Sequence, residues 1–232
     1  MGVDRAVLIA DPSRGVEPPA ARAFQQMARR RAQREPVAYI LGRKGFRRIE
    51  LDVDPRVLIP RPETEHVVEA ALELPEGARV VDVGTGSGAI ALALADERPD
   101  LRIVATDSSA DALAVARANA ARLGLDVEFL HGELLEPVTG RVDAVVSNPP
   151  YVRTGERLAP EIGYEPVEAL HAGPDGLEVY RRLIPAAASV PFIAVEVGAG
   201  QAAAVAELMA GRHIEIIRDL AGIERVIRGQ TP

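Results

Sequence analysis

The sequence contains no cysteine and no tryptophan, and aromatic residues make up only 3% of its 232 positions. Without cysteine the chain has no disulfide, no thiolate nucleophile and no cysteine-ligated zinc. Its four histidines are too scattered to show metal-ligand spacing: His66, His131, His171 and His213. We therefore expect chemistry that uses neither a thiol nor a bound metal.

Long apolar runs and an excess of positive charge are missing too. No stretch approaches the ~20 apolar residues that span a bilayer, and the opening MGVDRAVLIADPSRG lacks the basic start and apolar core of a signal peptide. We expect a cytoplasmic protein without a membrane partner. Lysine and arginine number 27 against 34 acidic residues, a net charge of −7, which argues against a duplex-binding surface.

Basic residues nevertheless gather early in the chain. Two interpretations stay open for this cluster, a solvated helix face or a contact surface for ribonucleoprotein or an acidic partner. The cluster consists of Arg29, Arg30, Arg31, Arg34, Arg43, Lys44, Arg47 and Arg48.

The first 75 residues predict a helix, a hairpin and a second helix. AARAFQQMARRRAQ has apolar residues at helical spacing, so we expect a helix that ends before Pro36 and packs Phe24 and Met27 into a core. KGFRRIELDVDPRVLIP alternates and predicts a hairpin with its turn near Asp54-Pro55. ETEHVVEAALEL then predicts a helix with acidic residues in its first turn.

From residue 79 onward, short apolar strands alternate with alanine-rich helices. Such alternation predicts a doubly wound α/β fold, a mostly parallel sheet covered on both faces. The expected strands are RVVDV, LRIVATD, DVEFL, DAVVSN and FIAVEV, and the expected helices are AIALALADE, SADALAVARANAARLG and DGLEVYRRLI. HIEIIRDL and ERVIRG finish the chain as a hairpin, which sets the last strand antiparallel.

A glycine-rich loop joins the first of these strands to its helix. Gly84, Thr85, Gly86, Ser87 and Gly88 form GTGSG, where glycines let the backbone turn tightly and approach a ligand at the carboxyl end of a strand. With the alanine that follows, the loop also satisfies the dinucleotide fingerprint, and a purely structural turn is a further alternative.

Asp107 ends the next strand, where a carboxylate can accept both hydroxyls of a ribose. A helix cap is the structural alternative, but neighbouring Ser108, Ser109 or Asp111 serves that role better. Asp82 and Glu133 are weaker candidates, for an ammonium group and an adenine edge respectively.

The most specific motif is Asn148-Pro149-Pro150-Tyr151, directly after a buried strand. An amide or aromatic-amine nitrogen is a poor nucleophile because its lone pair is delocalised. The side-chain carbonyl of Asn148 and the backbone carbonyl of Pro149 can each accept one N–H of such an NH₂ group and direct its lone pair at a methyl donor. The prolines hold these acceptors rigid, and Tyr151 can pack on the flat group and face a cationic sulfonium. A rigid turn without catalytic function is the alternative.

Several segments together make the chain resemble the release factor glutamine methyltransferase family, which modifies the glutamine of the Gly-Gly-Gln motif in peptide chain release factors. They are EPVAYILGRKGF, VLIPRPETE, DVGTGSGAIALALA, SNPPY, YEPVEAL, DGLEVYRRLI and DLAGIERVI. The resemblance implies a class I methyltransferase with a seven-stranded sheet, S-adenosylmethionine as methyl donor and S-adenosylhomocysteine as product. It also implies a monomer, with a release factor rather than nucleic acid as substrate.

By position, the resemblance implies cofactor contacts at Gly84 through Gly88, Glu133, Leu134, Asp107 and Asn148, with glutamine binding by Asn148 through Tyr151. Leu134 stands where relatives can carry an aromatic residue. The implied organisation is a shortened helical segment (1–36), a connecting hairpin (37–60) and the methyltransferase domain (61–232). The long stretch 152–173 is expected to close over the glutamine.

Three other functions remain open at this point. A DNA or RNA base methyltransferase also presents an NH₂ group to this tetrapeptide, but usually has a basic, aromatic-bearing recognition region. A catalytically silent adenosine-binding scaffold fits the short amino terminus, although Asn148 and Tyr151 are intact. A nicotinamide oxidoreductase fits the glycine loop, but hydride transfer does not require Asn-Pro-Pro-Tyr.

Overall fold

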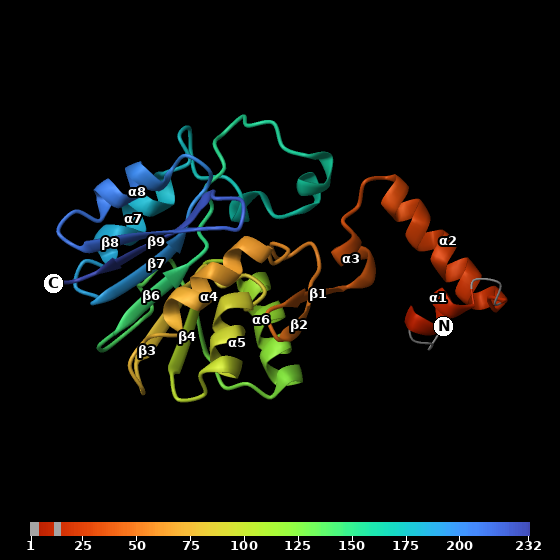
Figure 1. Ribbon diagram of the computed structural model, residues 1–232, viewed down its shortest axis with the longest axis horizontal. Helices are drawn as coiled ribbons and strands as arrows, with labels where there is room; N and C mark the ends of the chain where they lie inside the picture. The colour runs from red at the N-terminus through yellow and green to blue at the C-terminus, as the bar shows by residue number, and fades with distance from the viewer. Residues whose placement is uncertain (1–4, 12–14) are drawn as a thin grey trace.

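A seven-stranded sheet forms the centre of the molecule in the computed structural model, which describes residues 5–11 and 15–232 (Figure 1). The strand order is β5-β4-β3-β6-β7-β9-β8. The strands are β3 (Arg79–Val83), β4 (Arg102–Asp107), β5 (Glu128–His131), β6 (Ala144–Ser147), β7 (Phe192–Glu196), β8 (His213–Arg218) and β9 (Glu224–Gln230). The first five in the order pair in parallel, and β9 is antiparallel to both neighbours. The predicted doubly wound fold with an antiparallel last strand is confirmed.

Helices cover both faces of the sheet. The helices α4 (Glu65–Ala71), α5 (Ala89–Glu97) and α6 (Ala110–Leu123) pack on one face, and α7 (Glu178–Ala186) and α8 (Ala202–Leu208) on the other. Successive strand residues point to opposite faces, so Val80 joins the first core while Val81 and Val83 join the second. Burial on both sides explains the continuous apolar strands. The alanine-rich helix α8 was not predicted.

The order of the strands places a crevice beside β3. From β3 the chain adds β4 and β5 on one side, then crosses to β6 and β7 on the other. Ligands of open α/β sheets bind at such a switch point, outside the carboxyl ends of the strands. The glycine loop after β3 and Asn148 after β6 therefore meet at one edge.

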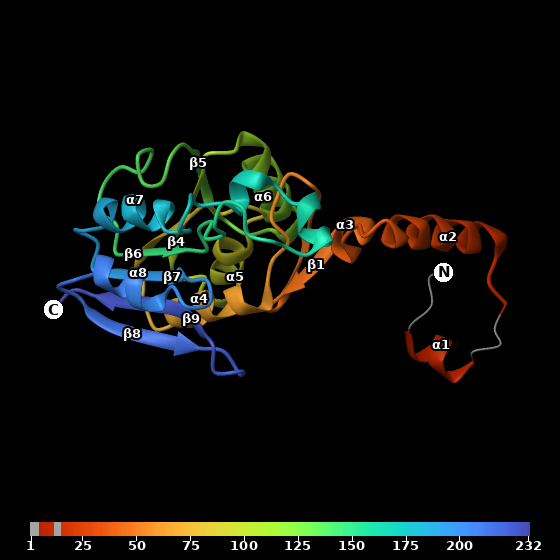
Figure 2. The same ribbon diagram turned by 90° about the horizontal axis from the view of Figure 1, so that it is seen from above.

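The helix α2 (Pro18–Ala32) extends away from the sheet, preceded by α1 (Arg5–Ala10) (Figure 2). The helix was predicted, but the core role of its apolar residues was wrong. Phe24 is 70% exposed and Met27 39%, and the described part of the chain buries no side chain of α2. The helices α1 and α2 together form an arm that stands off the sheet, and neither hydrophobic core cluster of the described residues includes any of its side chains. Among the described residues, no helix combines the length and apolarity needed to cross a membrane.

The predicted hairpin is present, but its turn lies elsewhere. After α3 (Val37–Leu41), strands β1 (Arg43–Phe46) and β2 (Ile49–Asp52) pair around Arg47 and Arg48, not around Asp54-Pro55. Arg47 adopts a left-handed φ of 49°, a conformation that the sequence does not announce because it is uncommon outside glycine. Asp54 instead starts a separate turn that its carboxylate closes by accepting the Arg56 N–H at 3.0 Å. The division at residues 36 and 60 stays a prediction, and residues 1–4 and 12–14 of its first part lie outside the described residues.

The early basic cluster finds acidic partners within the chain. Arg31 and Arg34 both bind Glu161, at 2.9 and 3.0 Å, and Arg47 pairs with Glu97 on α5. Part of the cluster thus joins the arm to the loop at 152–173, an arrangement that neither open interpretation included.

Candidate active site

The glycine loop turns sharply between β3 and α5. Gly84, Gly86 and Gly88 have φ values of 72°, 57° and 86°, in the left-handed region that favours glycine. A Cβ at Gly88 would lie 2.8 Å from the Leu92 side chain, whereas Gly84 and Gly86 line a cavity of about 280 Å³. The other two loop residues, Thr85 and Ser87, are buried and do not line the cavity.

Two carboxylates hold this loop in place. Asp82 Oδ2 accepts the Thr85 hydroxyl at 2.7 Å and the Ala91 N–H at 3.1 Å, and burial raises the Asp82 pKa to about 7. Asp107 lines the cavity, where its two oxygens accept the Gly86 and Ser109 N–H groups, each at 2.9 Å. Burial also raises the Asp107 pKa. Each Asp107 oxygen keeps a second lone pair for a ligand hydroxyl.

The far side of the cavity is formed after β5. Leu134 lines it with a left-handed φ of 49°, and Thr106 fixes that backbone by donating its hydroxyl to the Leu134 carbonyl at 2.8 Å. Backbone strain of this kind gathers at ligand sites. Glu133 also lines the cavity and pairs with Arg182 of α7 at 2.7 Å.

Asn148, Pro149 and Pro150 line the cavity beyond the end of β6. Asn148 donates its Nδ2 to the Thr64 hydroxyl at 3.0 Å, and Thr64 in turn donates to the buried Glu196 at 2.6 Å. Asn148 Oδ1 is buried and has no hydrogen-bond partner among the described residues. A buried acceptor without a partner is costly in the protein alone, so this oxygen is a candidate to accept a hydrogen bond from a ligand.

Tyr151 lies beside this cavity rather than in its wall. Its hydroxyl donates to Glu196 Oε1 at 3.3 Å, and burial raises its pKa. Its contact with a flat acceptor stays a prediction. Two glycines make room for the residue, because a Cβ at Gly176 would lie 2.3 Å from the Tyr151 carbonyl oxygen and one at Gly198 would lie 3.0 Å from its ring.

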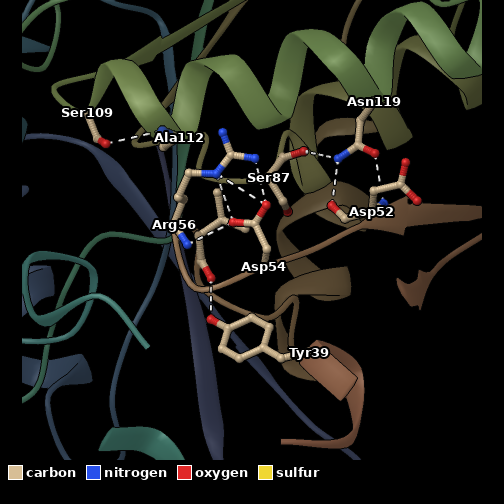
Figure 3. Close-up of polar contacts among 9 residues, drawn as sticks. Tyr39, Asp52, Asp54, Arg56, Ser87, Ser109, Ala112 and Asn119 are labelled. Carbon is tan, nitrogen blue, oxygen red and sulfur yellow. Dashed lines mark hydrogen bonds and ion pairs between the residues drawn. The ribbon is translucent and has the colours of Figure 1, made fainter. Parts of the chain in front are cut away.

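The segment before the sheet is tied to the glycine loop through α6 (Figure 3). Asn119 accepts the Asp52 N–H at 2.8 Å and donates to the carbonyl oxygens of Asp52 and Ser87, each at 3.0 Å. Tyr39 donates its hydroxyl to the carbonyl of Val57, a cavity residue, at 2.6 Å. Residues before the sheet thus form part of the cavity wall.

The segments IPRPET and YEPVEA contact each other directly. Glu165 pairs with Arg61 and accepts the Ile59 N–H at 3.0 Å. This pair holds the loop at 152–173 so that Pro166 and Glu168 line the cavity. The same loop meets the arm, where Tyr164 donates its hydroxyl to the Gln33 carbonyl at 2.8 Å.

Sequence reasoning missed Thr64, Glu165 and Glu196, the polar residues that hold the site together. Glu196 follows the apolar run FIAV at the end of β7, the same signal that marked Asp107 at the end of β4. His171, one of the four scattered histidines, is half-buried in this loop, and its Nδ1 is enclosed without a partner among the described residues. Its backbone bridges to Val152, which draws the ring inward.

The cavity suits an adenosine-containing methyl donor. Two glycines leave room for close approach, Asp107 offers acceptors for a ribose, and Asn148 stands at the end where transfer would occur. Asp107 does not separate such a donor from a dinucleotide, because dinucleotide-binding folds place a carboxylate at the same position to bind a ribose. The Asn148-Pro149-Pro150 segment in the cavity wall is the feature that hydride transfer does not require.

Comparisons with known proteins agree with this geometry. The family described as "Methyltransferase small domain" matches residues 56–182, and the "PrmC N-terminal domain" matches residues 1–42. Among solved structures, ribosomal protein L11 methylase from Lactobacillus delbrueckii subsp. bulgaricus has a TM-score of 0.55 at 21% identity, covering 74% of this chain and 78% of that one. A methyltransferase from Pyrococcus furiosus has a TM-score of 0.60 at 18% identity, covering 78% and 87%. These two likenesses show the fold.

Sequence relatives are more specific. The release factor glutamine methyltransferase of Neisseria gonorrhoeae is 46% identical over 218 residues, which cover 88% of this chain and 80% of that protein. The protein of that name from Geobacter sulfurreducens is 40% identical over 242 residues, covering 99% and 85%. This chain therefore belongs to the release factor glutamine methyltransferase family.

Proposed function

We propose that this chain transfers a methyl group from S-adenosylmethionine to the side-chain amide nitrogen of the glutamine in the Gly-Gly-Gln motif of a peptide chain release factor. The observation that carries the proposal is Asn148, which lines the cavity next to the glycine loop and whose Oδ1 is a buried acceptor without a donor among the described residues. An NH₂ group can satisfy it. Membership of the family names the glutamine as the source of that group.

The chain's own residues act by positioning. Asn148 Oδ1 accepts one N–H of the glutamine amide, and the Pro149 carbonyl is the proposed acceptor of the other. Held in this way, the nitrogen lone pair is directed along the line of transfer, which removes much of the entropic part of the barrier. Desolvation in the cavity strengthens both hydrogen bonds.

S-adenosylmethionine supplies an electrophilic methyl group on a cationic sulfur. Gly84 and Gly86 would leave room for it beside the loop, Asp107 would accept its ribose hydroxyls, and Leu134 would lie against its adenine. The acceptor nitrogen becomes acidic once it carries the methyl group and loses its proton to solvent. No general base is therefore assigned.

Mass spectrometry with isotopically labelled cofactor tests the proposal. Purified release factor, nucleic acid and bulk bacterial protein are each incubated with the enzyme, and the modified residue is located. We expect one added methyl group on the glutamine of Gly-Gly-Gln. Label on adenine or cytosine amino groups alone would replace this function with base methylation, and no label in any pool would support the silent scaffold.

A further inference from the structure

Whether Asn148 presents a hydrogen-bond acceptor or a donor to a ligand depends on the orientation of its side-chain amide. One end of an asparagine amide accepts hydrogen bonds, and the other end only donates. Rotation by 180° would present two donors to the NH₂ group of a glutamine and repel it. Neither the strand β6 nor the prolines that follow select one of these orientations, because both place the side chain in the same volume.

Thr64 selects the orientation. Its hydroxyl carries a single hydrogen, which is donated to Glu196 Oε2 at 2.6 Å. In its ionised form Glu196 cannot donate one back, so the Thr64 oxygen is left as an acceptor for Asn148 Nδ2 at 3.0 Å. The direction of both hydrogen bonds is thus set at Glu196 and leaves Asn148 Oδ1 as the free end.

The burial of this pair points to a role other than stability. Thr64 is 3% exposed and Glu196 1%, and a buried carboxylate is costly unless its hydrogen bonds offset the desolvation. Both oxygens of Glu196 are used on the same tetrapeptide, one through Thr64 to Asn148 and the other on the Tyr151 hydroxyl at 3.3 Å. The backbone of Glu196 is fixed as well, because Tyr180 donates its hydroxyl to the Glu196 carbonyl at 2.7 Å.

We propose that Thr64 and Glu196 are positioning residues that fix the side-chain amide of Asn148 with its oxygen toward the acceptor. The proposal rests on the proposed function for the identity of that acceptor. It assigns a task to two residues that do not line the cavity, and it predicts that their loss changes what Asn148 can recognise.

A matched pair of variants tests the proposal. Thr64→Val keeps the shape of the side chain and removes the hydroxyl, whereas Thr64→Ser keeps the hydroxyl. We expect Thr64→Val to lower kcat on release factor by about 10-fold to 100-fold with an unchanged Kd for S-adenosylhomocysteine, and Thr64→Ser to stay within about threefold of the parent protein. Equal kcat values for Thr64→Val and the parent protein would overturn the proposal.

Selectivity separates orientation from a general loss of structure. A release factor with glutamate in place of the Gly-Gly-Gln glutamine should be a weak competitive inhibitor of the parent enzyme, because Asn148 Oδ1 would face a carboxylate. In Thr64→Val the amide can turn its NH₂ outward, so the inhibition constant for this competitor should fall relative to the KM for release factor by about 10-fold. If the inhibition constant for the competitor and the KM for release factor rose by the same factor in Thr64→Val, the role of Thr64 would be merely structural and the proposal would be overturned.

A measurement without substrate keeps this inference separate from the proposed function. In the ¹⁵N-labelled protein with bound S-adenosylhomocysteine, the Asn148 side-chain NH₂ signal is identified by its loss in Asn148→Ala. We expect nuclear Overhauser contacts from this NH₂ group to the Thr64 methyl group, and their replacement by contacts to the cofactor in Thr64→Val. Unchanged contacts in Thr64→Val would refute the orientation role even if release factor proved not to be the substrate.

Discussion

Replacement of the buried Glu196 by glutamine should alter how the stability of the protein depends on pH. Burial raises the Glu196 pKa from 4.5 to about 7, against which hydrogen bonds from Thr64 and Tyr151 act in the opposite direction. The folded protein therefore binds this proton more tightly than the unfolded chain. Between pH 4.5 and pH 7 the folded state holds more protons, so its stability falls as the pH rises.

The size of the effect follows from the two pKa values. Each tenfold difference in proton affinity between the folded and unfolded states corresponds to about 1.4 kcal/mol. Glu196 should therefore make the free energy of unfolding roughly 2.5 kcal/mol smaller at pH 8 than at pH 5. Glu196→Gln removes this contribution and leaves that of Asp82 in place. The difference between pH 5 and pH 8, compared for the two proteins, isolates the single carboxyl group.

Urea denaturation followed by far-ultraviolet circular dichroism is the suitable assay, since the chain has no tryptophan to serve as a fluorescence probe. Both proteins are titrated with urea in the absence of cofactor at the two pH values. The free energies of unfolding are compared with the same slope of free energy against urea concentration for both proteins. The same change with pH in both proteins, within about 0.5 kcal/mol, would show that Glu196 has an ordinary pKa and that the burial argument is wrong.

Three further substitutions test separate parts of the site. Asn148→Ala should reduce kcat by roughly 10²-fold to 10³-fold, as loss of one fixed hydrogen bond at a reacting centre typically does, with a cofactor Kd that stays within about threefold by calorimetry. Asp107→Ala should weaken cofactor binding at least about 10-fold, since each hydrogen bond to a charged group contributes about 1.5–3 kcal/mol, and an unchanged Kd would contradict the ribose assignment. Gly176→Ala should destabilise the fold by about 2 kcal/mol more than Gly200→Ala, because both have positive φ but only the first places a Cβ 2.3 Å from the Tyr151 carbonyl. Equal unfolding free energies for the two glycine variants would refute that clash.

The sheet could be predicted from the sequence because its signals are local. Each buried strand is a short apolar run, and the helices after β3 and β4 are alanine-rich segments of the right length, so the order of these elements follows directly. The turn at Arg47-Arg48 could not be predicted in the same way. The alternating pattern runs without a break through both candidate turns, and the ion pair between Arg47 and Glu97 joins segments 50 residues apart.

The exposure of Phe24 and Met27 escaped prediction for a related reason. Periodicity shows that a helix has an apolar face, but not whether anything covers it.

In the site too, residues with a local sequence signal were predicted and residues linked over a long distance were not. Gly84, Asp107 and Asn148 were found because each sits at the end of its own strand, whereas the link between Thr64 and Glu196 joins residues 132 positions apart.

The acidic groups around the site share one physical role. Asp82 and Asp107 accept backbone or side-chain donors of the glycine loop, and Glu196 accepts from Thr64 and Tyr151. Asp82 and Glu196 thus order the protein around them, Asp107 holds the loop and keeps lone pairs for a ligand hydroxyl, and none of these roles is the removal of a proton from substrate. Transfer to an amide nitrogen suits such a site, because the reaction requires a fixed lone pair more than it requires a base. The buried carboxylates reduce stability through desolvation, and their hydrogen bonds fix the geometry of Asn148 and the glycine loop.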